Sequence, residues 1–234
     1  MLLEQMNWMQ VEEYLKKEDR LVLVAGTTEA HGYYSVATDT QIPWELAKVA
    51  CERENVILAP VLHYGVSPSL MAFPGTVTLE SGTYLDMIEQ ILRSFIRHGF
   101  KRILILTGHG SNVIAQNILA GLREEFPDVM IKFRSWYLTH RAAEFMMGLG
   151  GRPEHHGSWI EGFPWINQFA PVPTKVEPDV DWTDYKSVTP KELRARMIEG
   201  TGGGVFARDE KTMRAYFQEG LEDVLEVLQG EWKP

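Results

Sequence analysis

Residues 21–25 read LVLVA and lead through Gly26 into the polar turn TTEAHG at residues 27–32. A short apolar run rich in β-branched residues is typical of a strand buried on both faces of a parallel sheet. The pattern recurs at residues 102–106 (RILIL), which lead into the turn TGHGSN at residues 107–112. Because ligands of such sheets bind beyond the carboxyl ends of the strands, we predict that both turns face one crevice.

Strand and helix patterns alternate around these two runs. Residues 85–98 form the clearest amphipathic helix, and Gly99 is a suitable C-terminal stop. Residues 148–189 are rich in Gly, Pro and Trp, and we interpret them as long functional loops. The other predicted elements are strands at residues 56–62 and 129–133 and helices at residues 42–54, 113–125, 140–147, 190–199 and 212–228. The sequence therefore predicts a single doubly wound α/β domain over residues 1–234, with a mainly parallel sheet.

The composition excludes several classes of protein. Hydrophobic residues make up 44% and charged residues 24% of the 234 residues, which disfavours disorder and coiled coil. The net charge is −9 and the basic residues do not cluster, so we expect no nucleic-acid partner. No apolar run is long enough for a membrane span, and the first residues are acidic where a signal peptide needs basic ones, so we expect a cytoplasmic protein with no membrane partner. The single cysteine, Cys51, falls on a predicted helix away from the crevice, which disfavours a nucleophilic thiol.

Four carboxylate and imidazole side chains follow the two strands. Glu29 and His31 lie in the first turn, Asp39 lies in the connection before the next helix, and His109 lies in the second turn. Carboxylates and imidazoles are ligands for Zn²⁺, Mn²⁺ and Fe²⁺, and a bridging carboxylate would make two metals feasible. Against this, E-x-H is a common pattern, and an isolated loop histidine is more often a surface or core residue. The grouping at equivalent strand ends favours a metal site.

A second polar cluster lies in the loop-rich stretch. It comprises Glu154, His155, His156 and, further on, Glu161. The alternative interpretation is a solvated polar loop. Because successive side chains point apart, we expect one of His155 and His156 to do chemistry and the other to support it.

These motifs resemble those of the creatininase (creatinine amidohydrolase) family. The stretch LVLVAGTTEAHGYYSVATDT is similar to the family's Gly-Ser/Thr-x-Glu-x-His-Gly and Thr-Asp-Thr signature, and TGHGSN resembles its Asn-Gly-His-Gly-x-Asn. FPGT at residues 73–76 matches a further family segment, and His156 and Glu161 repeat the family's His-to-Glu spacing. The C-terminal GVFARDEKTMRAYFQEG loosely resembles the family's ending. The likeness extends in the family's order from about residue 20 to residue 220.

The resemblance implies a doubly wound fold, a hexamer, a binuclear metal centre, and hydrolysis of amide-like C–N bonds in small, often cyclic molecules. By position, Glu29 and His109 would bind one metal, His31 and Glu161 the other, and Asp39 would bridge them. The Glu161 assignment follows family members that use the later glutamate, since creatininase itself has a glutamate where this chain has Ser111. The ions would be zinc, manganese or both, with iron as an alternative.

The pocket around the centre departs from the family pattern. Tyr34 stands where a second histidine is usual, and the histidine common before FPGT is absent, so we do not expect this chain to be creatininase. We expect Tyr34, Trp159 and Ser111 at the substrate. Trp159 is favoured because it lies between His156 and Glu161. The wider set of aromatic candidates for the pocket wall is Trp136, Tyr137, Trp159, Trp165, Trp182 and Tyr185.

Three functions remain open from the sequence. The first is a metal-dependent hydrolase of a small cyclic amide or formamide, in which the metals lower the pKa of a water from about 15.7 toward ~7. In this hypothesis His156 gives a proton to the leaving group, with His155 as the fallback. The second keeps the metals and opens a cyclic ketone from sugar or inositol catabolism. The third is a metal-free oligomeric scaffold.

None of these three hypotheses assigns a role to one run of glycines. Residues 202–204 are three consecutive glycines. They are compatible with a turn that cradles an anion, but no nucleotide-binding pattern accompanies them. We therefore interpret the run as a flexible loop.

Overall fold

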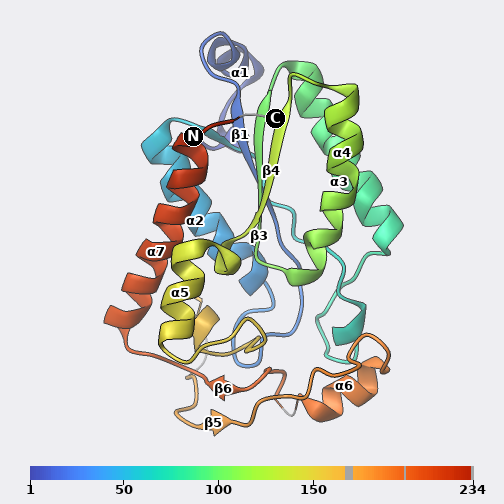
Figure 1. Ribbon diagram of the computed structural model, residues 1–234, viewed down its shortest axis with the longest axis vertical. Coiled ribbons are helices and arrows are strands. Elements are labelled where there is room, and N and C mark those ends of the chain that lie inside the picture. Colours follow the sequence, from blue (N-terminus) through green and yellow to red (C-terminus); the bar gives the residue numbers. More distant parts are fainter. Residues whose placement is uncertain (167–170, 198, 233–234) are drawn as a thin grey trace.

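The computed structural model describes residues 1–166, 171–197 and 199–232. Its main sheet has four parallel strands in the order β2-β1-β3-β4, of which Figure 1 labels β1, β3 and β4. The strands are β1 (Arg20–Ala25), β2 (Ile57–Leu58), β3 (Arg102–Thr107) and β4 (Met130–Ser135). The last residue of β1, Ala25, lies opposite the last residue of β3, Thr107. The two polar turns therefore begin at the same level of the sheet.

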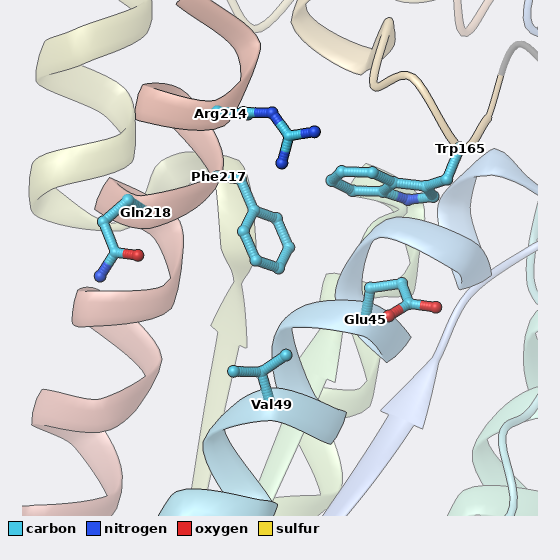
Figure 2. Close-up of a pocket in the computed structure, with 6 residues that line it drawn as sticks. All are labelled: Glu45, Val49, Trp165, Arg214, Phe217 and Gln218. Atoms are coloured by element: carbon cyan, nitrogen blue, oxygen red, sulfur yellow. The ribbon is translucent and has the colours of Figure 1, made fainter. Parts of the chain in front are cut away.

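Helices cover both faces of this sheet. One layer contains α2 (Thr38–Glu54), α5 (His140–Gly148) and α7 (Glu210–Gln229), and the other contains α1 (Trp8–Leu15), α3 (Ser81–His98) and α4 (Gln116–Glu125). A hollow of about 330 Å³ lies between α2 and α7 and is bounded by Trp165 (Figure 2). Its described lining residues include one carboxylate, Glu45, and no histidine.

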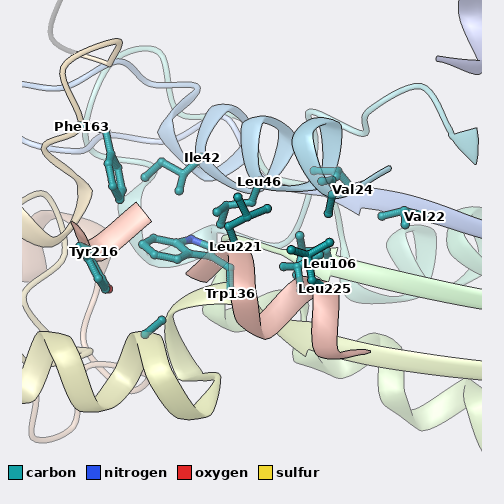
Figure 3. Close-up of a cluster of buried hydrophobic side chains, with 14 of the residues drawn as sticks. Val22, Val24, Ile42, Leu46, Leu106, Trp136, Phe163, Tyr216, Leu221 and Leu225 are labelled. Atoms are coloured by element: carbon teal, nitrogen blue, oxygen red, sulfur yellow. The ribbon is translucent and has the colours of Figure 1, made fainter. Parts of the chain in front are cut away.

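Alternate residues of the strands fill two separate cores. Val24 and Leu106 pack with Leu46 of α2 and Leu225 of α7 on one face (Figure 3). Leu23 and its alternate neighbours pack on the other face with α3. Strands that are apolar on both sides are thus buried on both sides. This arrangement confirms the predicted doubly wound α/β fold.

Two predicted boundaries were wrong around the first crossover. The helix expected at residues 42–54 begins at Thr38, so Asp39 lies in its first turn and not in a loop before it. Proline in a helix has no N–H to donate to the carbonyl four residues back. Pro43 therefore made the sequence indicate a helix that begins next to the proline and not four residues earlier. The strand expected at residues 56–62 has only two residues, since Pro60 cannot donate to a ladder.

Other elements differ in detail. The helix expected at residues 113–125 is a 3₁₀ segment, Gly110–Ala115, followed by α4, and α6 (Pro190–Arg196) is shorter than the helix expected at residues 190–199. Residue 198 lies outside the described residues. Helix α1 was not predicted, although Asn7 and Gln10 form a capping box at its start. The remaining 3₁₀ segments are Leu3–Gln5, Pro68–Leu70, Trp136–Leu138 and Trp159–Glu161.

The stretch expected to be loops at residues 148–189 contains one short strand. Strand β5 (Val176–Glu177) pairs antiparallel with β6 (Gly204–Val205), outside the main sheet. Both lie with α6 at the bottom of Figure 1, beyond the carboxyl ends of the main strands. Residues 167–170 of this stretch lie outside the described residues.

The burial of Cys51 and the character of the helices bear on two features that the sequence disfavoured, a nucleophilic thiol and a membrane span. Cys51 is fully buried in α2, and burial raises the pKa of its thiol to about 12, which leaves it protonated and unreactive. Among the described residues, no helix combines the length and the apolar character that crossing a membrane requires.

Candidate metal centre

Four residues predicted to lie together meet at the carboxyl edge of the sheet. Glu29 and His31 come from the loop after β1, Asp39 from the first turn of α2, and His109 from the turn after β3. All four are buried, with exposed fractions of 8% or less. Glu161, from the loop-rich stretch, joins them in one of the possible cation-binding groups.

Two of the three possible cation-binding groups share one carboxylate, that of Asp39, and the third group comprises Glu29, His31 and His156. In the first, His109 Nδ1 lies 3.3 Å from Glu29 Oε1 and 3.0 Å from Asp39 Oδ2. In the second, His31 Nε2 lies 3.0 Å from Asp39 Oδ1 and 3.8 Å from Glu161 Oε1. Within each group the ligand atoms all lie within 4.8 Å of one another. Asp39 therefore presents one oxygen to each group, which is the geometry of a bridging carboxylate.

Backbone carbonyls fix how the histidines face this cluster. The Nε2 atom of His109 lies 2.8 Å from the carbonyl oxygen of Val66, and Nδ1 of His31 lies 3.0 Å from that of Glu29. Only an N–H can donate to a carbonyl, so the other ring nitrogen of each neutral imidazole is a lone-pair donor that faces the carboxylates. Such anchoring of the distal nitrogen is typical of metal-ligating histidines.

The cluster has a strongly negative electrostatic field. Burial lowers the pKa of His31, but the nearby carboxylates of Asp39 and Glu161 outweigh it and raise that pKa to about 10. Burial also lowers the pKa of His109, and Glu29 and Asp39 raise it well above its usual value. Burial raises the pKa of Glu161. The field favours a cation here, either a proton on an imidazole or a metal ion.

Two buried carboxylate oxygens indicate whether these residues suit a metal ion. Glu29 Oε2 and Asp39 Oδ2 are buried, and neither accepts a hydrogen bond from the described residues. His109 Nδ1, 3.0 Å from Asp39 Oδ2, carries a lone pair when its Nε2–H donates to Val66. A buried carboxylate oxygen left in this way is costly unless something else satisfies it. A divalent cation satisfies both, and the mixed oxygen and nitrogen donors suit Zn²⁺, Mn²⁺ and Fe²⁺. The residues present fit the predicted metals.

A small cavity of about 50 Å³ opens onto the cluster. Two of the aromatic candidates, Trp136 and Tyr137, lie on its wall, directly after the end of β4. Burial, together with the charges of Asp39 and Glu161, raises the pKa of the Tyr137 hydroxyl, so it stays protonated beside the carboxylates. The remaining wall residues include Gly108, Gly110, Pro153 and Ile160.

The three residues expected at the substrate do not line this cavity. Trp159 is 1% exposed because its ring packs in the core beside Tyr216, with ring centroids 5.8 Å apart. The hydroxyl of Tyr34 donates to the carbonyl of Phe206, away from the cavity. Ser111 is exposed on the 3₁₀ segment after β3. Proximity in sequence to Glu161 therefore does not bring Trp159 to the cavity wall, whereas position after a strand end would have favoured Tyr137.

The two adjacent histidines face different surroundings. Nδ1 of His156 lies 3.7 Å from Glu29 Oε1, its Nε2 lies 2.6 Å from the carbonyl oxygen of Ala30, and His156 lines the cavity. His155 is buried with its Nε2 3.1 Å from Asp179 Oδ1, and it belongs to none of the possible cation-binding groups of the described residues. The geometry favours His156 for chemistry and leaves His155 for support.

Fold and centre together define an α/β protein with a buried carboxylate and imidazole cluster suited to divalent cations. The model of the creatininase (creatinine amidohydrolase) family matches residues 4–162. The chain therefore belongs to the creatininase family, as its motifs predicted.

Two curated relatives are similar in sequence. The creatinine amidohydrolase of Pseudomonas putida is 30% identical over 129 residues, which cover 51% of this chain and 50% of the relative. The 3-dehydro-scyllo-inosose hydrolase of Thermotoga maritima is 26% identical over 136 residues, which cover 56% of this chain and 43% of the relative. The chain thus spans about half the length of the curated relatives it matches.

Solved structures are similar along the whole chain. A creatininase described as the Mn form aligns with a TM-score of 0.76 and 20% identity, covering 100% of this chain and 99% of its own. A glutamate-to-glutamine creatininase mutant of the Zn-Zn type aligns with a TM-score of 0.78 and 18% identity, covering 100% and 98%. At this level of identity the likeness establishes the fold.

Proposed function

We propose that this protein is a hydrolase with two divalent metal ions per chain, which cleaves the C–N bond of a small cyclic amide or formamide. The observation that carries the proposal is the pair of ligand groups that share Asp39, one oxygen to each. A scaffold without metal has no need for such a set of inward-facing donors. The curated relatives of the family are named as hydrolases, which supports the same conclusion.

Each residue has a role in this proposal. Glu29 and His109 would hold one ion, His31 and Glu161 would hold the other, and Asp39 would serve both, as the grouping of these side chains supports. When bound, the ions polarise a substrate carbonyl and lower the pKa of a water toward neutrality. Zinc and manganese are the metals named for the solved creatininases, and both suit these donors.

The surroundings of His156 support a role for it as a proton carrier. Its Nε2 is anchored to the carbonyl of Ala30, so in the neutral ring Nδ1 is a proton acceptor that faces Glu29 and the cavity. The ring therefore takes up a proton at Nδ1 and can return it from there to a leaving group. The small cavity and its aromatic wall admit only a compact substrate.

Metal content and a paired substrate screen test the proposal. We expect about two divalent ions per chain in protein purified without chelator, measured by plasma mass spectrometry. We expect turnover of a lactam or formamide that is abolished by chelator and restored by Zn²⁺ or Mn²⁺. Metal-free protein that cannot be reloaded would contradict the proposal and favour the scaffold hypothesis.

The second candidate is ring opening of a cyclic ketone, and the inosose hydrolase relative supports it. It requires the same donors, so metal content does not separate the two candidates. Turnover of a cyclic diketone with no turnover of amides in the same screen would replace the first candidate with the second.

Replacing His156 separates proton transfer from metal binding. We expect His156→Ala to lower kcat by about 10²–10⁴-fold with metal content unchanged, because general acid–base catalysis contributes this much. Steady-state kinetics and metal analysis of the same sample measure both quantities. The matched control is His140→Ala, since the side chain of His140 is 81% exposed on α5. A kcat equal to that of the control would show that His156 carries no proton.

A further inference from the structure

The glycine run of residues 202–204 packs directly on the histidine loop. The N–H of Gly202 donates to the carbonyl of His156 at 2.6 Å, and the hydroxyl of Thr201 donates to the same carbonyl at 3.0 Å. A Cβ on Gly202 would lie 2.0 Å from the carbonyl oxygen of Glu154, so only glycine fits. The run expected to be a flexible loop is therefore packed across residues 154–156. We call residues 200–206, which contain it, the strap.

The strap is joined at its far side to the loop that carries Glu29 and His31. The N–H of Gly32 donates to the carbonyl of Gly200 at 2.9 Å, and the hydroxyl of Tyr34 donates to the carbonyl of Phe206. Gly32, Gly157 and Gly200 meet with positive φ angles of 55°, 69° and 73°. The strap thus ties the loop of His156 to the turn after β1.

His155 and Asp179 fasten the strap from the other side. The ring of His155 is 5% exposed, and a Cβ on Gly204 would lie 2.9 Å from its Nδ1. Its Nε2 lies 3.1 Å from Oδ1 of Asp179, two residues after β5. The next residue, Val180, donates its N–H to the carbonyl of Gly202 at 3.0 Å. One carboxylate therefore joins the histidine loop to the segment that pairs with the strap.

We propose that the His155–Asp179 pair is a latch of positioning residues, which holds His156 in place through the strap. Neither His155 nor Asp179 is among the described residues that line the cavity or form the possible cation-binding groups. The latch therefore acts on His156 through the backbone. Its catalytic consequence rests on the proposed function, whereas its effect on the backbone does not. The fallback role of His155 as a proton carrier is replaced by this one.

Variants of Asp179 test the latch, because its side chain is half exposed and can be changed without opening the core. Asp179→Ala removes the acceptor for His155. Asp179→Asn keeps a side-chain carbonyl that accepts from the same N–H, so we expect it to restore the wild-type behaviour. Arg152→Ala is the matched control, since Arg152 contacts the other oxygen, Oδ2, at 3.0 Å in an exposed ion pair.

Hydrogen–deuterium exchange by mass spectrometry is the first readout, because it requires neither metal nor substrate. In Asp179→Ala we expect amide exchange in residues 153–157 and 200–204 to accelerate about tenfold or more, with α3 unchanged. Exchange that matches Arg152→Ala throughout would overturn the latch, whatever the enzyme activity.

Kinetics on the metal-loaded protein is the second readout. We expect Asp179→Ala to lower kcat by about 10–100-fold with KM and metal content little changed, because small displacements of a catalytic group are costly. A merely structural role would lower the melting temperature and leave kcat per folded chain unchanged, which would overturn the positioning role. If the wild type neither binds metal nor turns over substrate, the proposed function fails, and the exchange result alone decides the latch.

Discussion

Asp39→Asn is expected to abolish metal binding at both positions and to lower turnover by about 10³-fold or more. The two oxygens of Asp39 lie 3.0 Å from ring nitrogens of His31 and His109, one in each ligand group. An amide has the same shape but offers one oxygen and no charge, so at least one group loses a donor and both lose the field that holds a cation. Replacing Glu161 would weaken one group only.

Three measurements on purified Asp39→Asn check this expectation. They are metal content per chain, kcat, and the shift in melting temperature on adding Zn²⁺ or Mn²⁺. Metal at a 100-fold excess over its Kd stabilises a one-site protein by about 2.7 kcal/mol, so the shift should occur in the wild type and vanish in the variant. Asp128→Asn is the control, since the side chain of Asp128 is 84% exposed. Full metal content in Asp39→Asn would show that Asp39 does not bridge.

Much of the fold was predictable because the strands are apolar on both faces. Residues 21–25 and 102–106 carry no alternation, which is typical of strands covered on both sides. Parallel strands also place their carboxyl ends at one edge, so the sequence alone brought Glu29 and His109 together. The structure confirms this geometry, with His109 Nδ1 3.3 Å from Glu29 Oε1.

The parts that could not be predicted depend on long-range packing. Glu161 reaches the cluster from a loop-rich stretch without periodicity, and only the family resemblance indicated its place. Trp159 is buried beside Tyr216 of α7, a contact that the local sequence does not encode. The hydrogen bond between His155 and Asp179 joins residues 24 apart in the sequence, in segments with little regular structure. Periodicity locates strands and helices but cannot align loops with one another.

The backbone of Asp39 depends on two glycines for its position. A Cβ on Gly26, after β1, would lie 2.5 Å from the carbonyl oxygen of Asp39, and a Cβ on Gly108, after β3, would lie 2.3 Å from the same atom. Gly26 directly precedes the first polar turn, and Gly108 lies in the second. The first turn of α2 therefore sits between the two turns, which is possible only where side chains are absent.

Gly108→Ala should consequently displace Asp39 without touching any ligand atom. The methyl group would lie 2.9 Å from the Cα and carbonyl carbon of Asp39, and backbone atoms cannot move aside as a flexible side chain can. We expect a loss of about 1–3 kcal/mol in the free energy of unfolding, as for other overpacked sites. Because the bridging carboxylate moves with its backbone, we also expect metal affinity to fall by about 10–100-fold.

Denaturant unfolding of the metal-free protein and metal titration measure these two effects separately. The matched control is Gly121→Ala, because Gly121 lies inside α4 and a Cβ there would meet no atom within 4 Å. Alanine in an open helical position is expected to stabilise the chain by about 0.5–1 kcal/mol, which is the opposite sign. If Gly108→Ala retained full stability and full metal affinity, the start of α2 would tolerate the added methyl group. The position of Asp39 would then not depend on close packing against the turn after β3.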